Sequence, residues 1–257
     1  MDRYIVAPDR IAAARWDTLR ERCSDPQVAE TAEAEARRVL QPWQGLSSLD
    51  ILRSLLVQIA VIGNARSGYR FGQALREPGL LKDLIAAPNT RAARLHAIAR
   101  SNGVRFVGAD MESPKVRAWC GILAHPKVTA DGVLVVRENL QTELGTLAVD
   151  DPVANRQARE ALMSWRLPMI GRKSWSDWLN NRGLTRHLLA IDTRLVGIWR
   201  RYLDARERLE DFQDAALYDA WERACEHHLA QSLAIHLSDL DKRLFVLSAV
   251  DRLNKVF

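Results

Sequence analysis

The segment from residue 47 to residue 65 constrains the fold more than any other part of the sequence. Its polar start, Ser47-Ser48-Leu49-Asp50, has the residue types that cap the N-terminus of a helix. The run that follows, ILRSLLVQIAVIGNA, is almost continuously apolar, and a helix that is apolar on all sides must be surrounded by other elements. We therefore predict a buried central helix here.

Helix signals recur along most of the chain. Segments rich in Ala, Glu and Arg at residues 8–24 and 26–43 are bounded by Pro or Ser, and Asp151-Pro152 supplies the cap and first position of a helix over residues 151–165. Only VRFVG (104–108) and GVLVVRENL (132–140) resemble strands, and both are brief. The sequence predicts an all-α protein of about ten or more helices.

The cysteines and the apolar runs exclude several classes of protein. Cys23, Cys120 and Cys225 are too far apart for a disulfide framework, a zinc knuckle or a four-cysteine iron–sulfur site. No apolar run reaches the roughly 18–20 residues of a membrane span, and the start of the chain lacks the apolar stretch of a secretory signal. We predict a cytoplasmic protein with no membrane partner.

Positive charge is concentrated in one region. Residues 151–201 contain ten Arg and Lys against four Asp and Glu, whereas the rest of the chain has 27 basic and 28 acidic residues. A localised basic surface is typical of proteins that bind a polyanion. A solvated basic face without a partner is the plainer alternative.

The basic region contains a helix–turn–helix segment over about residues 156–183. A tight turn, Leu167-Pro168-Met169-Ile170-Gly171, separates its two predicted helices, and Arg172-Lys173 follows the turn. Backbone N–H groups at a helix N-terminus attract anions, so a DNA phosphate is the expected guest. Nineteen residues after Lys173, Asp192 opens another predicted helix.

These two motifs resemble those of the endonuclease III-like, helix-hairpin-helix DNA glycosylases. That family has a Leu-Pro-Gly-apolar-Gly turn, often followed by Arg-Lys, and then an apolar–Asp–Thr/Val–His/Arg segment that residues 191–194 match. The spacing from Lys173 to Asp192 and the run KSWSDWLNNRG are similar to the 8-oxoguanine branch, which lacks an iron–sulfur cluster. The resemblance is specific over residues 150–203.

Three positions depart from the family pattern. Met169 replaces the first hairpin glycine, Trp175 stands where a small residue is usual, and Arg194 replaces a common histidine. These changes put in question how closely a phosphate approaches the turn and which base the protein accepts.

The resemblance implies a two-lobed helix-hairpin-helix glycosylase fold with the active-site cleft between the lobes. One lobe would be residues 52–186, including the hairpin, and the other residues 1–51 with 187–257. The implied partner is double-stranded DNA with a modified base, which the enzyme must flip out of the duplex. A nucleoid-associated monomer without a cofactor is expected, with a monovalent cation at the hairpin carbonyls as in relatives.

The resemblance also implies roles for individual residues. Asp192 would stabilise positive charge at C1′ and orient or deprotonate the nucleophile, and Lys173 would attack C1′ through a neutral amine and give the enzyme AP-lyase activity. The expected DNA contacts are Met169, Gly171, Arg172 and Arg194, with Asn64 and Arg66 in an intercalating loop. Trp175 would line the base pocket, unless its helical stripe with Trp178 and Leu179 is core.

Several functions remain open at this level. The substrate would be 8-oxoguanine or a hypermodified phage base, such as glucosylated hydroxymethylcytosine, excised in antiviral defence. A non-catalytic helix-hairpin-helix DNA-binding protein would carry the same basic region. A metal-dependent nuclease at the histidines of CEHH (225–228) and HLSDLDK (236–242) is the third class. Adjacent histidines point to different sides of a helix, so no metal site is predicted there.

Overall fold

The computed structural model describes residues 8–145 and 147–253. Helices account for 67% of this part of the chain and strands for 2%, which confirms the all-α class. None of its helices combines the length and the apolarity that crossing a membrane requires. The chain divides into two compact units, the first comprising Met1–Gln41, Ala148–Arg156 and Leu179–Phe257 and the second Pro42–Leu147 and Gln157–Trp178. The lobe boundaries expected from the sequence stay a prediction.

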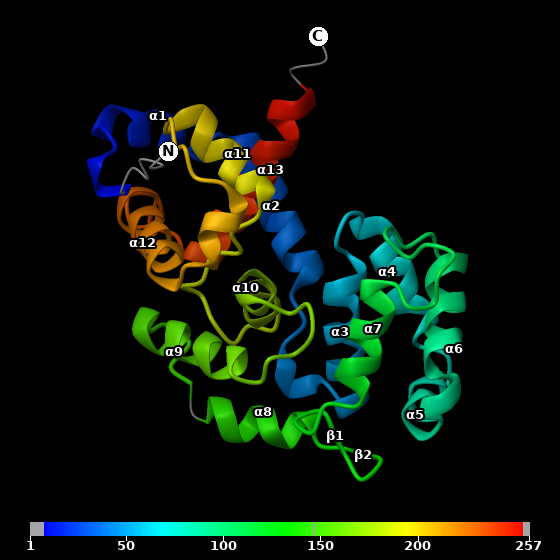
Figure 1. Cartoon of the computed structure of the whole chain (residues 1–257). Helices are drawn as coiled ribbons and strands as arrows, with labels where there is room; N and C mark the ends of the chain where they lie inside the picture. The colour runs from blue at the N-terminus through cyan, green and yellow to red at the C-terminus, as the bar shows by residue number, and fades with distance from the viewer. Residues whose placement is uncertain (1–7, 146, 254–257) are drawn as a thin grey trace. The chain divides into compact units, whose positions relative to one another are not determined.

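The second unit is built around α3 (Figure 1). Its elements before α9 are a 3-10 turn (Trp43–Gly45), α3 (Ser48–Ala60), α4 (Ala65–Ala74), α5 (Leu80–Ala86), α6 (Pro88–Ser101), α7 (Pro114–Leu123), β1 (Thr129–Ala130), β2 (Val133–Leu134) and α8 (Val136–Leu144). Two further helices, α9 (Pro152–Met163) and α10 (Arg172–Asn181), contribute residues to both units.

The predicted central helix is confirmed in α3. Ser47 Oγ accepts a hydrogen bond from the Asp50 amide at 3.2 Å, and Asp50 Oδ2 accepts one from the Ser47 amide at 3.2 Å, which is a capping box. The apolar side chains of α3 are buried against α4, α7 and α8. Trp119 of α7 donates its indole N–H to the carbonyl of Leu56 at 3.0 Å, which fixes α7 on α3.

The two strand-like runs behave differently from their pattern. Residues 104–108 form no strand, because Phe106 has a φ of 61° in the left-handed region, where an extended strand cannot continue. The run at 132–140 divides into β2, which pairs antiparallel with β1, and helix α8. Gly132, with a φ of 78°, makes the turn between the two short strands.

The first unit packs around a cluster of aromatic rings. Its elements are a 3-10 turn (Pro8–Arg10), α1 (Ala13–Ser24), α2 (Pro26–Val39), α11 (Thr193–Tyr202), a second 3-10 turn (Leu209–Gln213), α12 (Ala215–Cys225), a π-helical turn (Glu226–Ala230) and α13 (Leu237–Leu253). Trp199 of α11 stacks on Trp221 of α12 with ring centroids 4.3 Å apart, and Trp16 of α1 joins them. This core fixes the start of α11, where Asp192 lies.

Candidate active site

The predicted turn between two helices is confirmed at residues 164–171, between α9 and α10. Leu167 and Ile170 are buried and anchor the turn in the second unit. Pro168 lies against Gly121 of α7, where a Cβ atom would come within 2.8 Å of the proline ring. Farther along α10, Trp178 donates to the Ser54 hydroxyl of α3 at 2.8 Å. These contacts hold the turn and the start of α10 on the central helix.

Met169 occupies the position where the helix-hairpin-helix glycosylases, which the sequence resembles, have glycine. The backbone conformation at Met169 is one that glycine adopts most easily. Its φ is 59°, a left-handed conformation that costs about 1–2 kcal/mol for a residue with a Cβ atom. Its side chain is 42% exposed between the two buried anchors. Two residues on, a Cβ atom on Gly171 would have no atom of the described residues within 4 Å, its immediate chain neighbours aside. The main chain on this side of the turn is therefore open to a ligand.

Arg172 is engaged inside the hairpin. Its Nε and Nη2 atoms donate to the two carboxylate oxygens of Glu160 in α9 at 3.1 and 2.7 Å, and its side chain is 11% exposed. This two-point ion pair ties the start of α10 to α9. A phosphate contact by Arg172, as predicted, would have to compete with Glu160.

Lys173 is the second residue of α10 and is half-buried. Among the described residues, no side-chain or backbone acceptor is hydrogen-bonded to its amine and no carboxylate pairs with it. The lysine is therefore held by the helix while its amine stays available, as a nucleophile requires.

Asp192, in the first unit, is the N-cap of α11. Its Oδ1 accepts hydrogen bonds from the amides of Arg194 and Leu195 at 2.9 and 3.2 Å. Its Oδ2 accepts from Arg194 Nε at 2.7 Å and also from Arg194 Nη2. The carboxylate is thus fixed in one orientation, with a guanidinium on the oxygen that does not cap the helix.

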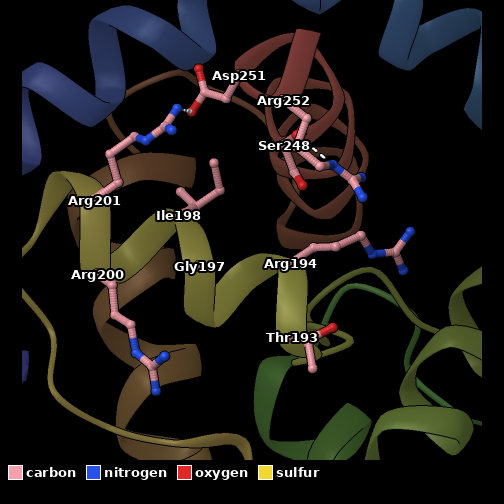
Figure 2. A pocket seen from close by; sticks show the side chains of 9 residues that line it. All are labelled: Thr193, Arg194, Gly197, Ile198, Arg200, Arg201, Ser248, Asp251 and Arg252. Atoms are coloured by element: carbon pink, nitrogen blue, oxygen red, sulfur yellow. Dashed lines mark hydrogen bonds and ion pairs between the residues drawn. The ribbon is translucent and has the colours of Figure 1, made fainter. Parts of the chain in front are cut away.

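Arg194 also lines a basic pocket of about 560 Å³ in the first unit (Figure 2). Four arginines line it, Arg194, Arg200, Arg201 and Arg252. Figure 2 shows the Arg201 side chain directed at Asp251 of α13, with a 2.6 Å ion pair between Nη1 and Oδ2. The guanidinium of Arg194 lies 4.4 Å from the centre of the Phe245 ring, which supports it as a cation–π partner. Such a pocket favours anions.

Sequence reasoning missed most of this pocket. Arg200 and Arg201 lie inside the basic region, so the charge count included them without placing them. Arg252 comes from α13, some fifty residues later in the sequence, and no local pattern connects it to α11. Only the packing of α13 on α11 brings Arg252 to the three arginines of α11.

Trp175 lies in the core of the second unit. Its side chain has no exposed surface, and its ring makes edge contacts with Trp165 and Trp178 at centroid distances of 6.1 and 5.7 Å. Of the two roles expected for Trp175, a base-pocket wall or a core residue, the structure supports the core residue. A base could stack on this indole only after the surrounding rings had moved.

The residues predicted to intercalate lie at the start of α4. Asn64 caps that helix, with its Oδ1 accepting from the Ser67 amide at 3.3 Å, and Arg66 is exposed. The structure adds a residue that the sequence did not suggest, Phe106, whose ring lies on Gly63 so closely that a Cβ atom there would overlap it. Phe106 is 69% exposed. The sequence predicts a strand over residues 104–108, and a strand pattern gives no reason to expect Phe106 to be exposed.

A buried lysine lies beneath Phe106. Lys115 of α7 donates to the carbonyls of Ala60 and Ile62 at 3.3 and 2.7 Å, and its Nζ is 5.6 Å from the centre of the Phe106 ring. Burial lowers the pKa of Lys115 to about 8, because the apolar surroundings disfavour its charged form. The contacts with Lys115 and Gly63 together fix the position of the Phe106 ring.

The chain matches no protein-family model and has no significant match among curated proteins.

Proposed function

We propose that this protein is a DNA glycosylase that flips out and excises a modified base. The observation that carries the proposal is the combination of a hairpin turn, a lysine that no described residue pairs with, and an aspartate cap 19 residues later. Each feature alone has a structural explanation. The two at this spacing are typical of the helix-hairpin-helix glycosylases, whose two-lobed fold we propose for the chain.

Asp192 supplies the charge that base excision needs. Cleavage of the N-glycosidic bond develops positive charge on the sugar, and a fixed carboxylate near C1′ stabilises it more than water can. The cap hydrogen bonds keep Asp192 oriented before the substrate arrives. Arg194 shares the second oxygen, so approach of the sugar would exchange one cation for another.

Lys173 makes a bifunctional reaction chemically accessible. An unprotonated amine at this position would attack C1′, and the bond from C1′ to the base would break with its electron pair leaving on the base. The departing base takes up the proton that the amine loses, and the C1′–O4′ bond then breaks with a proton delivered to O4′, which gives a Schiff base. Loss of a proton from C2′ of this Schiff base eliminates the 3′ phosphate. The absence of a partner on this amine within the described chain supports the assignment.

Contacts with double-stranded DNA would use both backbone and side chains. The open main chain at Met169 and Gly171 suits one phosphate, with a monovalent cation proposed at the hairpin carbonyls. Arg66 and the exposed ring of Phe106 suit the gap left by the flipped base. We further propose that the protein acts as a monomer in the nucleoid.

The substrate proposed first is an 8-oxoguanine-like base, because the 19-residue spacing is that of this branch. A hypermodified phage base such as glucosylated hydroxymethylcytosine is the alternative within the same chemistry. Trp175 does not discriminate between these two substrates, since its ring is enclosed in the core.

A non-catalytic DNA-binding protein is the second candidate function. It is favoured by the engagement of Asp192 with both the helix cap and Arg194, and of Arg172 with Glu160. Under this hypothesis Lys173→Gln and Asp192→Asn would weaken DNA binding only slightly and would change nothing else.

The deciding experiment is mass spectrometry of free bases released from a panel of duplexes. The panel holds oxidised, deaminated, alkylated and glucosyl-hydroxymethylated DNA, each incubated with wild type and with Asp192→Asn, with and without EDTA. Release of one base by the wild type alone would support the glycosylase and name its substrate. DNA binding without release from any duplex would favour the non-catalytic protein, and strand cleavage that EDTA abolishes would favour a nuclease.

A further inference from the structure

We propose that the first unit binds one divalent transition-metal ion of the zinc class at Asp150, His187 and His236. The three residues precede α9, follow α10 and precede α13, respectively. One ligand atom from each lies within 4.8 Å of the other two. His236 is the first residue of the HLSDLDK run, where the sequence alone predicts no metal site, whereas Asp150 and His187 come from other segments. The histidines of the CEHH run take no part, and the site is independent of the proposed glycosylase activity.

The hydrogen bonding of His187 prepares it as a ligand. Its Nδ1 is 2.6 Å from Glu226 Oε1, so Nδ1 carries the proton when the ring is neutral and Nε2 presents its lone pair. Metal-binding histidines characteristically have such a carboxylate on the other ring nitrogen, which fixes the tautomer and raises the basicity of the ligand. Glu226 itself is ion-paired with Arg156 at 3.9 Å.

Buried hydrogen bonds hold the three ligand-bearing segments together. Asn155, which has no exposed surface, accepts from the amides of Arg186 and His187 at 2.8 and 3.0 Å. Its amide group donates to the carbonyl of Ala148 at 3.0 Å. The amide of Ser238 donates to the carbonyl of Arg186 at 2.9 Å. The ligands therefore project from a backbone framework that is already fixed, which lowers the entropic cost of binding.

A cation already interacts with two of the ligands. Arg186 Nη1 lies 3.1 Å from Asp150 Oδ1 and 3.4 Å from His236 Nε2. Its side chain is half exposed, so the guanidinium can move into solvent when a smaller and more highly charged ion enters. Arg186 thus acts as a competitor, and its removal should strengthen metal binding.

The donor set selects the kind of metal. Two imidazole nitrogens and one carboxylate suit zinc and its neighbours, whereas Mg²⁺ and Ca²⁺ require oxygen ligands. In tetrahedral zinc coordination the ligand atoms are about 3.3 Å apart. The ligand atoms already lie within 4.8 Å of one another, and side-chain rotation of His236 and the exposed Asp150 would bring them to this separation. A fourth position stays open to water.

The test is isothermal titration calorimetry of the full chain with Zn²⁺ after EDTA treatment and dialysis. The wild type should bind one Zn²⁺ per chain. His187→Ala and His236→Ala should each weaken binding at least about tenfold, and Glu226→Gln by about 10–100-fold as an outer-shell partner. Arg186→Met should bind more tightly. His227→Ala is the matched control, because this exposed histidine follows Glu226 but lies outside the cluster.

Circular dichroism of each variant separates loss of the site from loss of the fold. Should His187→Ala unfold because Glu226 loses its partner, His236→Ala and Arg186→Met still decide. The absence of saturable binding by the wild type, or equal affinity in wild type and a folded His236→Ala, would overturn the proposal. Base release in EDTA, measured in parallel, reports on the glycosylase alone, so the two proposals fail separately.

Discussion

Asp192 uses its two carboxylate oxygens for different tasks: Oδ1 caps α11, and Oδ2 accepts from Arg194 Nε at 2.7 Å. An N-cap needs only an acceptor, and asparagine serves there nearly as well as aspartate. A charge-stabilising role at C1′ needs the negative charge itself. Replacement by asparagine therefore separates the structural role of Asp192 from the catalytic one.

We expect Asp192→Asn to lower the rate of base release by about 10²–10³-fold, the loss usual for a group that stabilises transition-state charge. The free energy of unfolding should change by less than about 1 kcal/mol. Single-turnover base release and urea unfolding measure the two quantities. Asp214→Asn is the control, because Asp214 caps α12 in the same way, accepting hydrogen bonds from the amides two and three residues later at 2.8 and 3.2 Å. This substitution should leave base release unchanged.

Lys173→Gln should abolish covalent trapping of the protein on cleaved DNA by borohydride. Only a primary amine forms the Schiff base that borohydride reduces, and glutamine keeps the length and polarity of the side chain. Gel analysis of the cross-linked species measures the outcome. Lys82→Gln, at an exposed position of α5, should trap as the wild type does, and trapping that persists in Lys173→Gln would show that another amine is the nucleophile.

The elements that sequence could predict are those whose cause is local. The Ser47 capping box, the Asp151-Pro152 start of α9 and the turn before α10 all depend on residues within a few positions of each other. The course of residues 104–108 could not be predicted, because it depends on contacts of Phe106 with Gly63 and Lys115 elsewhere in the sequence.

The same distinction separates the parts of the candidate site. Lys173 and Asp192 could be selected because each begins a helix within a recognisable motif. The ion pairs of Arg172 with Glu160 and of Arg194 with Asp192 are visible only in the folded structure, since composition shows only that basic residues are frequent. The cluster of Asp150, His187 and His236 joins three segments that have no common pattern.

Met169→Gly should stabilise the second unit by up to about 1.5 kcal/mol. Glycine removes the left-handed strain of about 1–2 kcal/mol at a φ of 59°, and the greater freedom of the unfolded chain offsets about 0.5–1 kcal/mol of that gain. Urea unfolding monitored by tryptophan fluorescence measures the change. Ala161→Gly, inside helix α9, should instead destabilise by about 1 kcal/mol. Destabilisation by Met169→Gly would mean that the exposed methionine packs more than its surroundings indicate.

Phe106→Ala should weaken binding to a duplex with an abasic or mismatched position by about 1–3 kcal/mol, the value of one aromatic–base stack. Because 69% of the side chain is exposed, the fold should lose little stability. Fluorescence anisotropy with matched and abasic duplexes measures the difference. Val133→Ala, at an apolar residue of β2 that is 62% exposed, is the control. Equal losses on both duplexes would indicate a general contact instead of insertion.

Lys115 should make the free energy of unfolding depend on pH in the alkaline range. Its pKa in the folded protein is lowered from 10.5 to about 8 by burial, so between these values the unfolded chain holds more protons than the folded one. Stability contributed by this group therefore rises from about pH 8 to about pH 10.5, by at most about 1.4 kcal/mol per pH unit. In Lys115→Met this rise should vanish. Urea midpoints at several pH values, taken as the difference between wild type and variant, cancel the other titrating groups. Parallel profiles would mean that the two carbonyls keep Lys115 charged throughout.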